Sequence, residues 1–197
     1  MKPIAVALTG ASGMPYAITL LKELVKTQEL IYVMISTAAN TVIAMETNLN
    51  LGTQSVEQNL TQYLGAKDGQ IKVFSKNQWT APVASGSNPP RAMVVVPCTM
   101  STLSAIANGH GDNLMHRAAD VVIKEQKKLI LVPRESPYSA IHLENMLKLS
   151  RLGVVIMDAN PAFYQNPQSI QDLVNFVVAR ILDHLDVNHA LAPPWQG

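Results

Sequence analysis

Five short apolar runs, rich in β-branched residues, recur along the chain and are separated by segments of helical length. The runs cover residues 4–8, 31–35, 93–96, 129–132 and 154–157. Uniformly apolar runs of this length are typical of parallel strands that are covered by helices on both faces. We therefore predict an α/β fold, a three-layer αβα sandwich around a mostly parallel sheet of the Rossmann or flavodoxin type.

Segments with apolar residues at helical spacing lie between and after these runs. They cover residues 15–26, 37–47, 101–107, 113–125, 141–151 and 170–185. The region from 53 to 90 is less regular, and we expect an additional helix and a short strand at 71–74 there. Because no repeat, low-complexity tract or linker interrupts the pattern, we expect residues 1–197 to form a single domain.

Few charges are available to cover this fold. Charged residues make up 15% of the chain and hydrophobic residues 48%, against about 25% charged residues in an ordinary soluble domain. We therefore expect a homo-oligomer.

The formal net charge of +1 provides no long-range field for nucleic acid or an anionic membrane. No apolar run approaches the ~20 residues that span a bilayer. We expect a cytoplasmic protein, and the single cysteine, Cys98, agrees with a reducing compartment.

The first predicted strand leads through a glycine turn into the first predicted helix. The turn, Thr9-Gly10-Ala11-Ser12-Gly13, would present free backbone N–H groups and the positive end of a helix dipole, which suit a phosphate. Its two glycines are three residues apart, so it matches neither the G-x-G-x-x-G dinucleotide motif nor the P-loop. Two interpretations stay open from the turn alone, a phosphate cradle and a tight packing turn.

Polar residues also follow the other predicted strands. In open parallel sheets, ligands bind outside the carboxyl ends of the strands. The strand-end segments cover residues 9–13, 36–37, 97–102, 133–137 and 158–164. They bring hydroxyls, glycines, an arginine and a glutamate to one edge, a composition suited to a phosphorylated ligand. Any single hydroxyl can instead serve as a helix cap.

Several motifs spread along the chain occur together in one known order. They are Thr9-Gly10-Ala11-Ser12-Gly13, Ser36, Met45-Glu46-Thr47, Ala84-Ser85-Gly86-Ser87, Pro97-Cys98-Thr99-Met100-Ser101-Thr102-Leu103-Ser104, residues 117–125, Pro133-Arg134-Glu135-Ser136-Pro137, Pro161-Ala162-Phe163-Tyr164 and Trp195-Gln196-Gly197. In this order they resemble the UbiX-type flavin prenyltransferases, a family long labelled aromatic-acid decarboxylases. The resemblance implies that dimethylallyl phosphate prenylates reduced FMN at N5 and C6, and that the product serves a UbiD-type decarboxylase. It also implies a dodecamer whose active sites borrow residues from neighbouring subunits.

The resemblance assigns roles to individual residues. The FMN-binding residues would be Gly10, Ala11, Ser12, Ser36, Thr99, Met100, Ser101, Thr102 and Arg134. The residues around the prenyl phosphate would be Lys124, Tyr164, Arg180, Trp79 and Trp195. Protons around N5 and C6 would be handled by Ser12, Glu46 and Glu135.

The implied reaction is one that needs no metal. A phosphate leaves an allylic carbon readily when preplaced positive groups meet its growing charge, and two cations and a phenol supply this. Magnesium sites in prenyl-transferring enzymes use aspartate-rich clusters. This chain has no such cluster in its sequence, and the scattered pair Asp183 and Asp186 comes nearest to one. Its five histidines show no ligand spacing. We expect FMN, as prenyl acceptor, and no metal.

Simpler alternatives stay open. Arg180 can be a surface residue paired with Asp183 or His184, Lys124 can lie on an exposed charged face, and Glu135 can stiffen its loop by pairing with Arg134. For the whole chain, one alternative is an FMN-dependent cysteine decarboxylase of the same fold. That family typically has a catalytic histidine and a Pro-Ala-Ser-Ala-Asn-Thr loop, which residues 97–102 do not match. The other alternative is a non-catalytic flavin-binding module.

Overall fold

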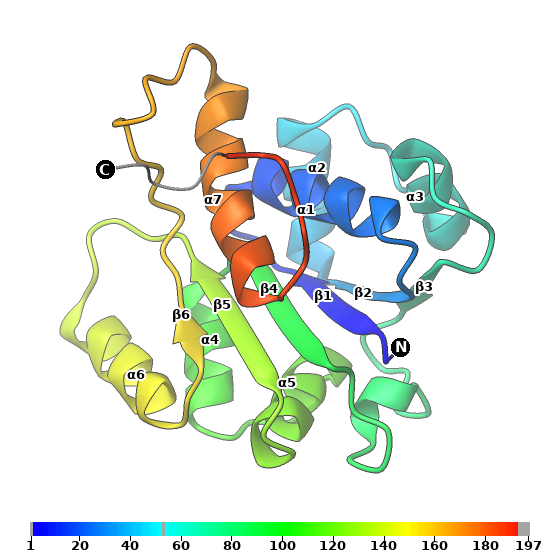
Figure 1. Cartoon of the computed structure of the whole chain (residues 1–197). Helices are drawn as coiled ribbons and strands as arrows, with labels where there is room; N and C mark the ends of the chain where they lie inside the picture. Colours follow the sequence, from blue (N-terminus) through cyan, green and yellow to red (C-terminus); the bar gives the residue numbers. More distant parts are fainter. Residues whose placement is uncertain (1, 53, 193–197) are drawn as a thin grey trace.

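Six parallel strands form one open sheet at the centre of the molecule (Figure 1). The computed structural model describes residues 2–52 and 54–192. The strands are β1 (Ile4–Leu8), β2 (Ile31–Ile35), β3 (Ile71–Phe74), β4 (Ala92–Cys98), β5 (Lys128–Pro133) and β6 (Val155–Ile156). Their order across the sheet is β3-β2-β1-β4-β5-β6. From β1 the chain adds strands on one side and then, from β4, on the other side, so the switch point of the sheet lies between β1 and β4. The predicted parallel sheet is confirmed, and such sheets bind ligands at this switch point.

Helices cover both faces of the sheet, as predicted. They are α1 (Met14–Lys26), α2 (Thr37–Glu46), α3 (Val56–Leu64), the 3₁₀ turn η1 (Pro82–Ala84), α4 (Met100–Ala107), α5 (Leu114–Lys124), α6 (Ala140–Arg151) and α7 (Ile170–His184). Alternate residues of β1 point to opposite faces. Ile4, Val6 and Leu8 pack in the core that contains α1 and α7, whereas Ala5 and Ala7 pack with α4 and α5. Figure 1 shows these two helical layers on either side of the sheet.

Three of the predicted apolar runs differ in their bounds from the strands. β5 extends one residue beyond the run 129–132 at each end. The third predicted run ends at Val96. Instead β4 continues to Cys98, and a register shift between Val95 and Cys98 accommodates Pro97. The last strand is limited to Val155–Ile156, because it is an edge strand that pairs with β5 alone. The helix and short strand expected between residues 53 and 90 are present as α3 and β3.

A large apolar surface remains uncovered on the single chain. Helix α6 fully buries only Leu149. The exposed large apolar side chains on or beside α6 and near the start of α7 are Ile141, Leu143, Leu147, Leu152, Phe163, Tyr164 and Ile170. Such exposed apolar area is typical of surfaces that contact another molecule. None of the helices that the structure describes is long and apolar enough to cross a bilayer.

Truncating a buried side chain of α1 tests the packing of this layer. Leu21 is fully buried between α1 and the sheet, and Leu21→Ala should lower the free energy of unfolding by about 2–5 kcal/mol because it leaves a cavity. Denaturant unfolding at a fixed protein concentration measures this. Gln62→Ala, on the exposed face of α3, is the control and should change the value by less than about 0.5 kcal/mol. Equal effects of both variants would contradict the described core.

Candidate active site

The turn after β1 is held by a carboxylate from another helix. Gly13 is the N-cap residue of α1, with φ 126°, and its own segment provides no side-chain cap. Instead the Glu46 carboxylate, at the end of α2, accepts hydrogen bonds from the backbone N–H groups of Gly13 and Met14, each at 2.9 Å. The start of α2 packs tightly on the same turn, because a Cβ at Gly10 would overlap that of Ala38. The predicted anion site at the start of α1 is therefore filled by Glu46.

Glu46 also links two of the predicted site residues. Burial raises the pKa of Glu46, but the hydrogen bond with Ser12, those from the backbone, and the charge of Arg134 outweigh burial and hold this pKa below its ordinary value. A carboxylate with a lowered pKa is a weak base. Glu46 is therefore better suited to orient the exposed Ser12 hydroxyl than to remove a proton.

The ends of β1 and β4 are joined by a buried hydroxyl. Thr9 Oγ1 donates to the backbone oxygen of Pro97 at 2.7 Å and accepts from the backbone N–H of Thr99 at 2.8 Å. Thr99 in turn caps α4, because its Oγ1 accepts from the backbone N–H of Thr102 at 3.2 Å. Sequence reasoning missed this role of Thr9, although a threonine that ends a uniformly apolar strand was the available signal.

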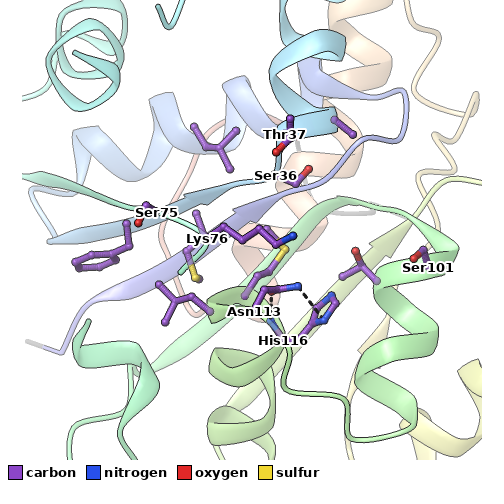
Figure 2. Close-up of a pocket in the computed structure, with 14 residues that line it drawn as sticks. Ser36, Thr37, Ser75, Lys76, Ser101, Asn113 and His116 are labelled. Atoms are coloured by element: carbon purple, nitrogen blue, oxygen red, sulfur yellow. Dashed lines mark hydrogen bonds between the residues drawn. The ribbon is translucent and has the colours of Figure 1, made fainter. Parts of the chain in front are cut away.

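A cavity of about 280 Å³ opens at the same edge, beside the ends of β2 and β3. The predicted FMN residues Ser36, Ser101 and Thr102 line it. Ser36 also caps α2, since its Oγ accepts from the backbone N–H of Ala39 at 3.1 Å. Its role as a helix cap is thus confirmed, and its role as an FMN contact stays a prediction. Polar residues that sequence reasoning did not select complete the lining: Thr37, Ser75, Lys76, Asn113 and His116 (Figure 2).

The histidine of this cavity is fixed by two neighbours. His116 is 9% exposed, and its Nδ1 lies 2.6 Å from Oδ1 of Asp112. This contact lowers the pKa of Asp112. Asn113 caps α5, with Oδ1 accepting from the backbone N–H of His116 at 3.0 Å. The sequence carried no signal for this role, because an isolated histidine is more often a core residue than a ligand-binding one.

Arg134 and Glu135 follow β5 at this edge without pairing with each other. The backbone N–H of Arg134 donates to the backbone oxygen of Cys98 at 3.3 Å. The Glu135 carboxylate accepts from the backbone N–H of Ser136 at 3.2 Å. Across residues 2–52 and 54–192 there is no ion pair between Arg134 and Glu135. The loop-stiffening alternative for Glu135 is therefore not supported, and the charge of Arg134 acts on Glu46 instead.

Tyr164 and Arg180 lie together on the outer side of α7. Both line a second cavity, of about 530 Å³. The ring of Tyr164 packs edge-on against Phe176, with centroids 5.8 Å apart. The Arg180 guanidinium donates to the Asp183 carboxylate at 2.6 Å, which confirms the ion pair considered as its simpler role.

Lys124 lies at the opposite edge of the sheet from Arg134 within one chain. It ends α5, four residues before β5 begins at Lys128, whereas Arg134 follows the last residue of β5. Six strand residues separate the two edges by about 20 Å. The Lys124 ammonium contacts the Glu125 carboxylate and lies beside Gly86. A single chain therefore does not bring Lys124 close to Arg134 and the other residues predicted to bind FMN at the carboxyl edge of the sheet.

Trp79 is not part of these cavities. Trp79 is 48% exposed in the segment between β3 and η1 and lines neither cavity. Trp195 lies outside the described residues. Within the described part of the chain, no three His, Cys, Asp or Glu side chains gather as a metal site.

Polar residues at the carboxyl edge of a reversing parallel sheet are typical of nucleotide-binding proteins. The family model described as Flavoprotein matches residues 1–182, so the chain is a flavoprotein. Flavin prenyltransferase UbiX of Pseudomonas aeruginosa is 53% identical over 194 residues, which cover 98% of this chain and 93% of that protein. The chain therefore belongs to the UbiX-type flavin prenyltransferases, and the predicted resemblance is confirmed.

Solved structures agree with this assignment. AnUbiX (PadA1), in complex with FMN and dimethylallyl pyrophosphate, has a TM-score of 0.89 and 39% identity, covering 100% of this chain and 98% of its own. A dodecameric FMN-dependent UbiX-like decarboxylase from Escherichia coli O157:H7 has a TM-score of 0.88 and 40% identity, covering 99% of this chain and 100% of its own. The peptidyl-cysteine decarboxylase EpiD, at 14% identity and a TM-score of 0.56, shares the fold alone. The prenyltransferase assignment thus replaces the two alternatives.

The Glu46 contact predicts a pH-dependent contribution to stability. A carboxylate whose pKa is lowered on folding stabilises the fold above its ordinary pKa of 4.5, and this stabilisation is lost as the pH falls through the lowered value. Glu46→Gln should cost about 1 kcal/mol of unfolding free energy at pH 7 and progressively less below about pH 4. Denaturant unfolding across this pH range measures the difference. Glu144→Gln, exposed on α6, is the control; a pH-independent effect of Glu46→Gln would contradict the contact.

Proposed function

We propose that this chain joins the dimethylallyl group of dimethylallyl phosphate to N5 and C6 of reduced FMN, without a metal. In this proposal N5 displaces phosphate from C1 of the prenyl group and gives up its proton. The prenyl double bond then takes up a proton, and the resulting tertiary cation bonds to C6, which loses its proton. The product, prenylated FMN, serves a UbiD-type decarboxylase. The observation that carries the proposal is the group formed by Ser12, Glu46 and Arg134 at the switch point of the sheet. The complex of AnUbiX with FMN and dimethylallyl pyrophosphate supports it.

The described contacts suit three proton and charge roles at this edge. Glu46 orients the Ser12 hydroxyl, which faces N5 in this proposal. Glu135 is half-buried and is not paired with Arg134 in the described structure, so its carboxylate is available to take the C6 proton. Arg134 adds a permanent positive charge close to Glu46.

The departing phosphate is met by Tyr164, Arg180 and Lys124 in this proposal. A guanidinium, an ammonium and a phenol stabilise growing negative charge through preplaced donors. The structure pairs Arg180 with Asp183 and Lys124 with Glu125, so each cation exchanges a carboxylate for the phosphate when the donor binds. Because Lys124 lies at the far edge of its own sheet, we assign this lysine to a site on a neighbouring copy.

A homo-oligomer, and specifically a dodecamer, is part of the same proposal. The exposed apolar side chains of α6 and of the segment before α7 offer surface for contacts between copies. The E. coli relative that is 40% identical is dodecameric. Trp79, exposed in one chain, and Trp195 are assigned to the wall of the prenyl pocket once copies assemble.

Anaerobic incubation with reduced FMN and dimethylallyl phosphate tests the reaction. Mass spectrometry should detect a flavin heavier by one prenyl unit, and the yield should not change with EDTA. Arg180→Ala should lower the rate about tenfold or more, because one donor to the leaving phosphate is lost, while FMN binding is retained. Arg151→Ala, which removes an exposed arginine at the end of α6, is the matched control.

The outcomes of this assay separate the parts of the proposal. Bound FMN without a heavier product would refute prenyl transfer. Loss of product with EDTA, restored by a divalent cation, would refute metal independence. After equal incubation times, a UbiD-type apo-decarboxylase should gain activity with the wild-type mixture and correspondingly less with the Arg180→Ala mixture.

Mixing two impaired variants tests whether a site draws on two chains. If Lys124 and Arg180 of one site come from different copies, oligomers assembled from equal amounts of Lys124→Ala and Arg180→Ala chains contain about a quarter intact sites. Co-expression with different affinity tags yields such oligomers, and tandem purification isolates them. Activity near a quarter of wild type is expected. A mixture no more active than either variant alone would place both residues in one chain.

A further inference from the structure

The start of α1 is a poor place for the phosphate of a nucleotide. Its first backbone N–H groups, those of Gly13 and Met14, already donate to Glu46. The pKa of Glu46 is lowered, so this carboxylate is negative at neutral pH. A phosphate at the same N–H groups would meet a like charge at close range. The turn that resembled a phosphate cradle in the sequence therefore favours a neutral part of the flavin.

The cavity beside β2 and β3 has the opposite charge. Lys76 lines it, and Figure 2 shows this side chain extending across the cavity, with its end between Ser36 and Asn113 in this view. The residues that line it include no aspartate or glutamate, so no lining carboxylate neutralises the lysine. A volume of about 280 Å³ is at the lower end for ligand pockets, which suits one end of a nucleotide rather than all of it.

The backbone fixes where Lys76 lies. Its carbonyl oxygen accepts a hydrogen bond from the backbone N–H of Leu114 at 2.9 Å, which ties the segment after β3 to the start of α5. The backbone N–H of Ser75 donates to the side chain of Gln78 at 3.3 Å and closes a turn around the lysine. The backbone of Lys76 is thus held at the mouth of the cavity, while its side chain is exposed. Ser36 and Ser101 provide hydroxyl groups on the facing wall.

We propose that Lys76 binds the phosphate of FMN in this cavity and thereby makes the protein select FMN over riboflavin. This inference rests on the proposed function, since it takes FMN as the ligand. The ammonium forms a charge-assisted contact with the phosphate. Riboflavin, which lacks the phosphate, gains nothing from the lysine.

Titration of the purified protein with FMN and with riboflavin, at low and high salt, tests this role. Lys76→Gln should weaken FMN binding about five- to tenfold, and less at high salt, while riboflavin binding changes less than about twofold. Lys76→Arg should retain the preference for FMN. Lys72→Gln, which removes the same charge from exposed β3, is the control and should leave both affinities unchanged.

Other outcomes overturn the inference. Equal weakening of FMN and riboflavin by Lys76→Gln would show a structural role only, and an unchanged FMN affinity would show no role. Glu46→Gln distinguishes the two phosphate positions: it should strengthen FMN relative to riboflavin only if the phosphate binds at the α1 turn, which would also refute the inference. If the wild-type protein binds neither flavin, the proposed function itself fails.

Discussion

The Thr9 side chain holds together the part of the sheet on which the site depends. Its hydroxyl joins the ends of β1 and β4 at the point where strand order reverses. The glycine turn starts from one of these strands, and the loop from Thr99 to Thr102 starts from the other. Because Thr9 is 1% exposed, water does not compete for its two hydrogen bonds. These two hydrogen bonds therefore fix the position of the turn relative to the loop.

The sheet and its helices follow from patterns local to the sequence. Apolar runs and helical periodicity are properties of neighbouring residues, so they predicted the layers and most element boundaries. The run predicted at 93–96 was too short, because a register shift carries β4 past Pro97 to Cys98. The edge strand β6 was predicted too long because its shortness reflects pairing with β5 alone.

The site was less accessible to sequence reasoning, since its contacts join distant positions. Glu46 lies 33 residues from the backbone that it caps at Gly13, and no spacing rule connects the two. Lys76 and His116 line the cavity, but the sequence segments that contain them carry no recognisable motif. The family resemblance selected Lys124, which one chain places at the opposite end of β5 from Arg134. Motifs thus identified residue types, and only the structure related them in space.

The position of Glu46 has a consequence for anions in the surrounding solution. Helix starts such as that of α1 are among the places where proteins hold free anions best. With a carboxylate of the chain itself seated there, free sulfate and phosphate meet a like charge and are repelled from the start of α1. The chain thus supplies the anion that this helix start would otherwise take from solution.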